Sequence, residues 1–356
     1  MGGRTALMAG VLLASAALTG CAGVSTPPRA SYPATDVPAL AETAPVGTAQ
    51  ADAADDPAIW RNAANPAASL ALGTDKKAGL YVYSLDGNVR DFVPAGALNN
   101  TDLREVRRAD DSSLILVGAS DRTDLIHPRI ALFALDGMTA KLTAMGAETF
   151  LPAGHAPAEA YGFCMGGPLA AGELARAYVV LKDGEIAESR LIERGSRITP
   201  EYVRSVKLAT QSEGCVIDDA SATLFAAEEN VGIWKVPLGA DAMTAQAFAS
   251  VGEAHGLVAD VEGLAIAGRR LIASSQGDNA YAVFDMASGS LLGRFRVNGG
   301  AIGGTSETDG IEVALGDFGP QFPEGLFVAQ DGDNAPKAQN FKLTSWEAIR
   351  EALGLD

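Results

Sequence analysis

The sequence contains few of the residues on which zinc enzymes and nucleophilic hydrolases depend. Its three histidines, His127, His155 and His255, show no H-x-x-x-H or other zinc-like spacing. It has three cysteines, none in a clear catalytic context, and no G-x-S-x-G nucleophile elbow. Zinc chemistry and covalent catalysis by a serine or cysteine therefore have little support.

Basic residues are also scarce relative to acidic ones. The chain has 27 Lys and Arg against 44 Asp and Glu, which gives a formal net charge of −17. A protein with this field should not bind nucleic acid or an anionic membrane surface through its general charge. We expect no nucleic-acid partner, and we expect the protein to prefer or require cations.

Cysteine is too rare for a disulfide scaffold. Only Cys164 and Cys215 remain beyond Cys21, which belongs to the N-terminal motif described next. A single bridge between them is open in an exported protein. Two buried free thiols are the favoured interpretation, because unpaired cysteine behaves as a small buried hydrophobic residue.

The N-terminus has the pattern of an export signal. Arg4 is followed by the apolar run "ALMAGVLLASAAL", which is too short for a membrane-spanning helix. The ending "LTGC" resembles the lipobox of bacterial lipoproteins, in which the cysteine is lipidated; an ordinary cleavable signal is the alternative. We therefore expect a lipoprotein signal peptide over 1–20, lipidation at Cys21, a Pro/Ala/Thr-rich tether over 21–40 and one folded domain over 41–356.

A lipid anchor would place the protein in the cell envelope. Ala22 follows the cysteine, without the aspartate linked with inner-membrane retention in some Gram-negative bacteria. We expect the outer membrane, with release outside the cell as an alternative and no membrane contact other than the anchor. No oligomer signal is evident, so a monomer is expected.

Short apolar runs of strand length recur along the chain, each followed by a tight turn such as Asp-Gly. The runs at 78–89 and 128–137 align as "YVYSLDG" and "ALFALDG", about 50 residues apart. Helix signals are confined to "TPEYVRSV" and "SWEAIREAL". This pattern predicts an all-β fold, a six-bladed β-propeller of four-stranded antiparallel blades, rather than a β-sandwich or a parallel β-helix.

Acidic residues occur beside glycine and apolar residues at predicted strand ends. Packed carboxylates repel one another and raise each other's pKa unless a cation intervenes. Many oxygen ligands without a His or Cys cluster favour Ca²⁺ over zinc or copper. The residues in such positions are Asp55, Asp56, Glu213, Glu228, Glu229, Asp260, Glu262, Asp309, Asp331 and Asp333.

Basic residues gather after predicted turns at Lys76, Lys77, Arg122 and Lys182. Each one alone is most simply a solvent-facing side chain. Beside a cluster of carboxylates and metal ions they would instead bind an anion, and Arg122 would suit bidentate contact with phosphate.

A series of long motifs resembles the β-propeller phytases, which are calcium-dependent, alkaline-type enzymes. The resemblance runs in order from about Glu42 to Glu347. It is carried by "DAADDPAIW", "TDKKAGLYVYSLDG", "LNNTDLR", "YGF", "QSEG", "AAEENVGIWK", "DVEGLAI", "ASSQGDNAYAVFD", "GTSETDGIEV", "GLFVAQDGDN" and "QNFKLTSWE". The resemblance implies a six-bladed propeller that binds several Ca²⁺ ions and hydrolyses phosphate monoesters of myo-inositol hexakisphosphate (phytate).

The resemblance also implies roles for individual residues. It places an active-site tyrosine at Tyr161 and a structural calcium at Asp331 and Asp333 of "AQDGDN". Cys215 departs from the pattern, because it follows the glycine of "SEG" at an apolar position. The implied calcium ligands are Glu42, Asp55, Asp56, Glu213, Glu229, Asp260, Glu262 and Asp309, and the implied phosphate-binding residues are Lys76, Lys77, Arg122 and Lys182.

The mechanism expected from this assignment is direct hydrolysis. A calcium-bound water attacks phosphorus and no phospho-enzyme forms. Lys76 and Arg122 stabilise charge on the equatorial oxygens, and Lys77 and Lys182 hold a neighbouring phosphate. The catalytic set is thus Asp55, Asp56, Lys76, Arg122, Tyr161 and Glu213. The alternatives are a non-catalytic envelope lipoprotein that binds ligands, and another metal-dependent propeller hydrolase such as a phosphodiesterase or lactonase.

Overall fold

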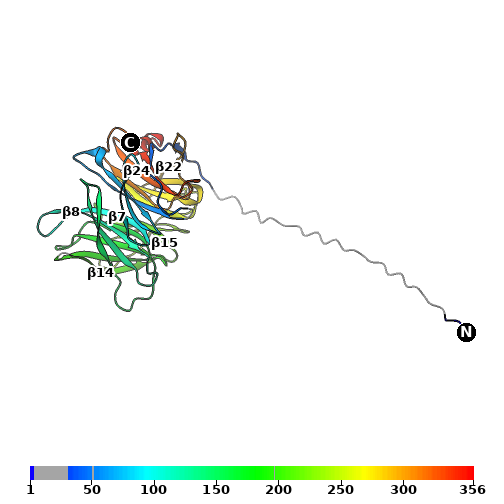
Figure 1. The fold of residues 1–356 in the computed structure, drawn as a ribbon, viewed down its shortest axis with the longest axis horizontal. Coiled ribbons are helices and arrows are strands. Elements are labelled where there is room, and N and C mark those ends of the chain that lie inside the picture. Colours follow the sequence, from blue (N-terminus) through cyan, green and yellow to red (C-terminus); the bar gives the residue numbers. More distant parts are fainter. Residues whose placement is uncertain (4–30, 50–51, 196) are drawn as a thin grey trace.

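The computed structural model describes residues 1–3, 31–49, 52–195 and 197–356 (Figure 1). Cys21 and residues 4–20 of the expected signal peptide lie outside them. Among the described residues, no helix has the length and apolar character needed to cross a membrane.

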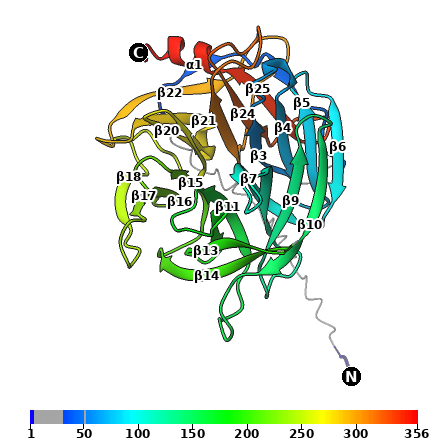
Figure 2. The same cartoon turned by 90° about the vertical axis from the view of Figure 1, so that its left-hand side faces the viewer.

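Six sheets form a ring around a central axis, with β3, β7, β11 and β15 nearest the centre in Figure 2. Each of the first four sheets follows chain order between its inner and outer strands. Blade 1 is β3 (Ala54–Trp60), β4 (Leu70–Asp75), β5 (Gly79–Ser84) and β6 (Val89–Pro94). Blade 2 is β7 (Leu98–Arg107), β8 (Ser113–Asp121), β9 (Arg129–Asp136) and β10 (Lys141–Thr149). Blade 3 is β11 (Ala160–Gly166), β12 (Ala175–Leu181), β13 (Glu185–Arg194) and β14 (Arg197–Lys207). Blade 4 is β15 (Ser212–Asp218), β16 (Thr223–Glu228), β17 (Gly232–Pro237) and β18 (Gln246–Ser250).

The last two sheets include strands from the N-terminal part of the chain. Blade 5 is β19 (Val261–Ala267), β20 (Arg270–Ser275), β21 (Ala280–Asp285) and β22 (Leu291–Val297), extended by β1 (Thr35–Val37). Blade 6 is β23 (Ile311–Leu315), β24 (Gly325–Asp331), β25 (Asn340–Ser345) and β2 (Ala41–Glu42). The helical elements are η1 (Pro66–Ala68), η2 (Gln276–Asp278) and α1 (Trp346–Ala352). The prediction of a six-bladed propeller with four-stranded antiparallel blades is confirmed.

The ring is closed by pairing the two ends of the folded chain. Strand β2 pairs antiparallel with β25, with Ala41 opposite Leu343, and the blue and red strands therefore lie together in Figure 2. Closure of this kind protects the edges that an open sheet would expose.

Strand β1 lies within the segment 21–40 that the sequence suggested as a tether. It pairs parallel with β22, and Val37 packs with Phe295 and Val297 in the core between blades 5 and 6. The fold therefore begins before residue 41. The few apolar residues of this segment, scattered among prolines and polar residues, carried too little periodicity to show this.

The two helix predictions have different outcomes. The prediction for "SWEAIREAL" is confirmed by α1, which Ser345 caps by accepting a hydrogen bond from the Ala348 backbone N–H. The prediction for "TPEYVRSV" is wrong, because this segment forms part of β14. Its residues pair with β13 over most of the length of both strands, and this pairing outweighs a weak local helix preference.

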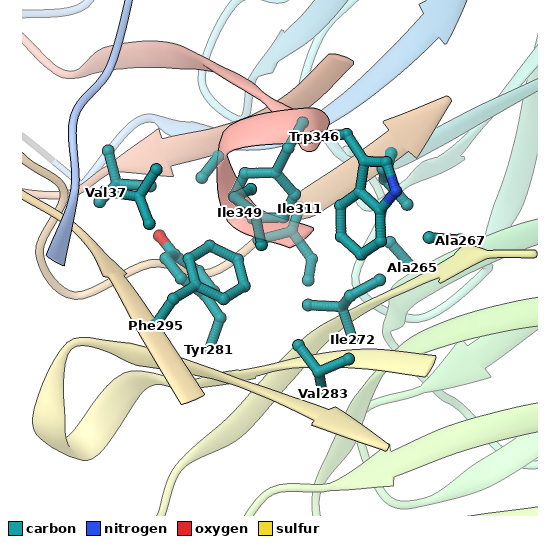
Figure 3. Close-up of a cluster of buried hydrophobic side chains, with 14 of the residues drawn as sticks. Val37, Ala265, Ala267, Ile272, Tyr281, Val283, Phe295, Ile311, Trp346 and Ile349 are labelled. Atoms are coloured by element: carbon teal, nitrogen blue, oxygen red, sulfur yellow. The ribbon is translucent and has the colours of Figure 1, made fainter. Parts of the chain in front are cut away.

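The core lies between adjacent blades rather than inside a single layer. In Figure 3, Val283 and Phe295 of blade 5 face Ile311 of blade 6 and Trp346 of α1. Because each blade packs on both faces, its strands are apolar on both sides. The polar residues near the central axis therefore lie on the inner strand of each blade or just before it.

A disulfide joins Cys164 of β11 to Cys215 of β15, so the preference for two free thiols is wrong. These inner strands belong to blades 3 and 4, and their cysteines face each other with Cα atoms 5.7 Å apart, within the range for a bridge. The sequence did not reveal that strands so far apart in the chain are neighbours.

Candidate active site

Each blade places one polar side chain near the start of its inner strand. In five blades this residue lies where the pairing of the inner strand with the next strand shifts by a residue or more. In blade 6 it lies just before β23. A β-bulge of this type redirects a side chain out of the regular alternation. The six residues, in blade order, are Asp55, Asn99, Tyr161, Glu213, Glu262 and Asp309.

Glycine follows four of these residues because neighbouring inner strands approach very closely. A Cβ atom added at Gly162 would lie 1.8 Å from the carbonyl oxygen of Glu213 in the next blade. At Gly310 it would lie 2.6 Å from the carbonyl oxygen of Asp55. The glycines of motifs such as "YGF" and "QSEG" therefore let the polar residues of adjacent blades come together.

Three of these polar residues, Tyr161, Glu262 and Asp309, line a pocket of about 350 Å³. The described residues that line it are Asp52, Lys76, Tyr161, Gln211, Glu229, Asp260, Glu262, Gln276, Glu307, Asp309, Gln330, Gly332 and Gln339. Carboxylates and amides dominate this lining. The pocket is suited to cations and to a highly polar ligand.

Glu213, Glu229 and Glu262 form a buried three-glutamate cluster. Each offers one carboxylate oxygen, and these oxygens lie within 4.8 Å of one another. Burial, together with the charge of Asp55 on Glu213 and of Glu213 on Glu262, raises the pKa of Glu213 and Glu262. Glu262 Oε2 and Asp55 Oδ2 are buried and accept no hydrogen bond. This set of unsatisfied oxygen donors fits a hard divalent cation such as Ca²⁺.

Lys76 is surrounded by three carboxylates next to this cluster. Its Nζ atom lies 2.7 Å from Asp52 Oδ1, 3.0 Å from Asp55 Oδ1 and 3.0 Å from Asp309 Oδ2. Burial by itself would lower the pKa of Lys76. The negative charges of Asp55, Asp309 and Asp52 outweigh this effect, so the pKa of Lys76 is raised. Burial and the charge of Asp55 raise the pKa of Asp309 to about 8. Lys76 is thus a fixed positive charge in the pocket.

Arg122 and Lys182 form a cationic pair that lies against the ring of Tyr161. The Arg122 guanidinium carbon lies 5.5 Å from the centre of the Tyr161 ring, and Lys182 Nζ lies 4.8 Å from it. Burial and then the charges of Glu213 and Glu262 raise the pKa of Tyr161. The tyrosine therefore keeps its proton and can donate a hydrogen bond.

Lys77 is placed differently from Lys76. Its side chain is exposed, its backbone N–H donates to Asp75 Oδ1, and it is not among the residues that line the pocket. Two adjacent lysines that look alike in sequence thus occupy different environments, because neighbouring side chains in the turn after β4 diverge.

Asp55 and Asp56 also diverge. Asp55 faces Lys76, whereas Asp56 Oδ2 accepts a hydrogen bond of 2.9 Å from the Thr101 backbone N–H. Asp56 lines a small cavity of about 20 Å³ with Asp102 and Glu312, where burial raises the pKa of Asp56. The two carboxylates do not meet at one point, so a cation at Asp55 would not be shared with Asp56.

Glu42 and Asp331 come together at Lys342 instead of in the pocket. Lys342 Nζ lies 2.5 Å from Glu42 Oε2 and 3.3 Å from Asp331 Oδ2. Burial opposes ionisation of Glu42, but hydrogen bonds from Lys342 and Asn340 outweigh it and lower the pKa to about 2. Lys342 thus lies between the two carboxylates, and neither Glu42 nor Asp331 is among the residues that line the pocket.

Comparison with known proteins agrees with this architecture. A family model described as Phytase matches residues 4–356. The 3-phytase of Bacillus subtilis (strain 168) is 38% identical over 332 residues, which cover 89% of this chain and 85% of that protein. The chain belongs to the phytase family. The enzyme is accordingly a phosphoric monoester hydrolase.

Solved structures show weaker likenesses to this phytase-family chain. The β-propeller domain of Cps50 (Swd1) from Myceliophteria thermophila is 12% identical with a TM-score of 0.47, covering 81% of this chain and 82% of that one. A chain of a mitotic checkpoint complex is 11% identical with a TM-score of 0.47, covering 91% and 84%. These values add nothing to the sheet topology described above.

Several residues of the phytase-family site were not identified from the sequence. Gln276 Nε2 donates to Asp309 Oδ1 at 2.7 Å, and Gln211 Nε2 donates to Glu229 Oε1 at 2.7 Å. These glutamines gave no signal, because they lie outside the inner strands. Asn99 did give one: in "LNNTDLR" it takes the place that Asp55 takes in "AADDPAIW".

Proposed function

We propose that the enzyme is a calcium-dependent phytase that removes phosphate from myo-inositol hexakisphosphate and binds several Ca²⁺ ions. One observation carries this proposal: the three-glutamate cluster and the cationic pair of Arg122 and Lys182 meet at Tyr161, which itself lines the pocket. Carboxylates alone would repel a polyphosphate. Bound metal inverts the local field and makes the pocket attractive to an anionic substrate.

Calcium would be held by the three-glutamate cluster together with Asp55, Asp260 and Asp309 around the same pocket. These residues supply only oxygen donors, in agreement with the ligand preference of Ca²⁺. When bound, calcium would supply positive charge to the phosphate oxygens and would lower the pKa of a bound water below that of bulk water. Asp56 faces the small cavity below the pocket, where it would serve a separate cation.

The chain's own residues would bind and orient the substrate. Arg122 would contact two phosphate oxygens with its planar guanidinium, while Lys76 and Lys182 act as point charges. Tyr161 would donate a hydrogen bond from its hydroxyl group. Positioning and charge neutralisation provide most of the catalysis in phosphoryl transfer.

Direct hydrolysis without a phospho-enzyme is the route that this lining supports. Among the described residues that line the pocket there is no serine, threonine, cysteine or histidine. The one hydroxyl group is that of Tyr161, whose raised pKa makes it a poor nucleophile. Water is therefore the proposed attacking group.

We further propose that the enzyme is exported and anchored in the outer membrane by lipid on Cys21. The lipobox-like ending "LTGC" supports the anchor, and the Cys164–Cys215 disulfide suits an oxidising compartment. Replacing Cys21 by serine should move the protein from the membrane fraction to the soluble fraction. Unchanged membrane association would contradict the anchor.

Phosphate release from phytate tests the catalytic proposal. Activity should be high with added Ca²⁺, should be lost after treatment with a chelator, and should return when Ca²⁺ is restored. Phytate should be preferred over p-nitrophenyl phosphate, which has no neighbouring phosphate for Lys182. Full activity of chelated enzyme would rule out calcium dependence, and a preference for phosphodiesters or lactones would rule out phytase activity.

A further inference from the structure

Asn99 occupies in blade 2 the position that charged or phenolic residues hold in the other five blades. It lies in β7, in the irregular pairing between Leu98 and Thr101, and its side chain is fully buried at 0% exposure. A buried amide at this position needs partners for its donors and its acceptor. Its side-chain partners are the neighbouring Asn100 and one group from each half of the proposed site.

The Asn99 amide bridges a cation and an anion. Its Oδ1 accepts a hydrogen bond of 2.7 Å from Arg122 Nη1, and its Nδ2 donates one of 2.6 Å to Glu213 Oε1. A guanidinium can only donate and an ionised carboxylate can only accept, so these partners fix the orientation of the amide. Both hydrogen bonds are charge-assisted and therefore strong.

We propose that Asn99 is a positioning residue that holds the Arg122 guanidinium and the Glu213 carboxylate at a fixed separation. Phosphate bound by Arg122 and a cation bound by Glu213 then lie at a set distance from each other. The reacting atoms tolerate little misplacement, and an error of about 1 Å can cost about 100-fold in rate. The inference rests on the proposed function for its kinetic readout.

Arg122 has a competing partner, which is why it needs this support. Its Nη2 lies 2.7 Å from Glu159 Oε1, away from the three-glutamate cluster. With Asn99 removed, Glu159 is the remaining carboxylate partner of Arg122, and Glu213 loses a neutral donor. Both groups would then be free to move away from each other.

Asparagine is suited to this position because it is neutral. An aspartate of the same shape would still accept from Arg122, but it would bring a negative charge against Glu213. A leucine of similar volume would serve neither group. The two substitutions therefore separate the two contacts of the amide.

The test compares Asn99→Asp and Asn99→Leu in the calcium-loaded enzyme with phytate. For Asn99→Asp we expect KM within about two-fold of the unsubstituted enzyme and kcat lowered by about 10-fold or more, because the donor to Glu213 is lost while the acceptor for Arg122 remains. For Asn99→Leu we expect a similar fall in kcat and a KM raised by about five-fold or more. The increase in melting temperature on adding Ca²⁺ should shrink in both variants.

Asn62→Leu provides a matched control. Asn62 is a buried asparagine outside the pocket, and its Oδ1 accepts backbone hydrogen bonds from Ala64 and Asn65 in a turn. Its loss should lower the melting temperature without altering kcat or KM. If Asn99→Leu does not fold, the isosteric Asn99→Asp still decides the matter. Any result in which Asn99→Asp fails to separate kcat from KM overturns the proposal, whereas an unsubstituted enzyme inactive on phytate refutes the proposed function instead.

Discussion

The disulfide between Cys164 and Cys215 joins the two inner strands that carry Tyr161 and Glu213. Each cysteine lies two or three residues beyond the site residue on its strand. The bond therefore ties blade 3 to blade 4 immediately below the pocket. It also adds a covalent link to strands that otherwise meet through side-chain packing and the close approach of Gly162 to Glu213.

Removing the disulfide should destabilise the protein. The bond closes a segment with a sequence separation of 51 residues. A loop of this size corresponds to about 4 kcal/mol of unfolding free energy in the chain-entropy model. The Cys164→Ala/Cys215→Ala variant should therefore unfold at lower denaturant concentration, with a loss of about 3 to 4 kcal/mol.

Reductant provides the control for this prediction. It should destabilise the unsubstituted protein and leave the double variant unchanged in the same denaturant titration. Equal stability of the oxidised protein and the double variant would contradict the prediction.

Neutralising one member of the three-glutamate cluster should have opposite effects with and without metal. Glu262→Gln removes a buried carboxyl group. Burial and the charge of Glu213 raise the pKa of that group. In chelator at pH 8 the variant should melt at a higher temperature than the unsubstituted protein, because the repulsion is relieved. In Ca²⁺ it should melt at a lower temperature, and its calcium affinity should fall by about 100-fold or more.

Melting curves in both conditions and calcium titration calorimetry measure these effects. Glu351→Gln, an exposed substitution on α1, serves as the control and should change neither value. A Glu262→Gln protein that melts at a lower temperature in both conditions would show that the carboxylate is structural and not a cation ligand.

Calcium binding should strengthen as pH rises towards about 8. The folded pKa of Asp309 is raised from its ordinary value of 3.8 to about 8, by burial and the charge of Asp55. A raised pKa means that the unfolded chain gives up this proton first. The contribution of Asp309 to stability without metal is thus present below about pH 4 and is lost as pH rises to about 8. Calcium requires the carboxylate form, so its affinity should increase over the same interval and level off above it.

Calcium titrations of the melting temperature between pH 6 and 9 test this dependence. Asp309→Asn should weaken calcium binding and flatten its pH dependence. A profile in the unsubstituted protein that is already level at pH 6 would contradict the raised pKa.

Much of this architecture follows from the sequence, and the exceptions have physical causes. Recurring apolar runs with Asp-Gly turns were sufficient for the propeller, because each blade repeats the same local pattern. The site residues at Glu213 and Glu262 were recognisable by the glycine that follows each of them. The repeat also aligns Asn99 with Asp55, but a neutral amide lacks the charge that marks the other site residues.

Contacts between distant segments could not be predicted in the same way. The pairing of Cys164 with Cys215 depends on which inner strands are neighbours. The position of Lys342 between Glu42 and Asp331 depends on where the ammonium group of a buried lysine lies in the folded chain. The local sequence around these residues does not indicate which distant segments will lie next to them in the fold.

The difference between Arg122 and Lys77 gives the final prediction. Arg122 lies against Tyr161, which lines the pocket, and presents a planar donor group, whereas the Lys77 side chain is exposed. Arg122→Lys keeps the charge but loses bidentate contact, so KM for phytate should rise by about 10-fold and kcat should fall. Lys77→Ala should change KM by less than about two-fold, because an exposed charge is screened by solvent and salt.

Steady-state phosphate release at fixed Ca²⁺ measures the KM and kcat of both variants. Equal losses in the two variants would show that substrate reaches the outer turn at Lys77, and the phosphate site would then extend beyond the pocket described here.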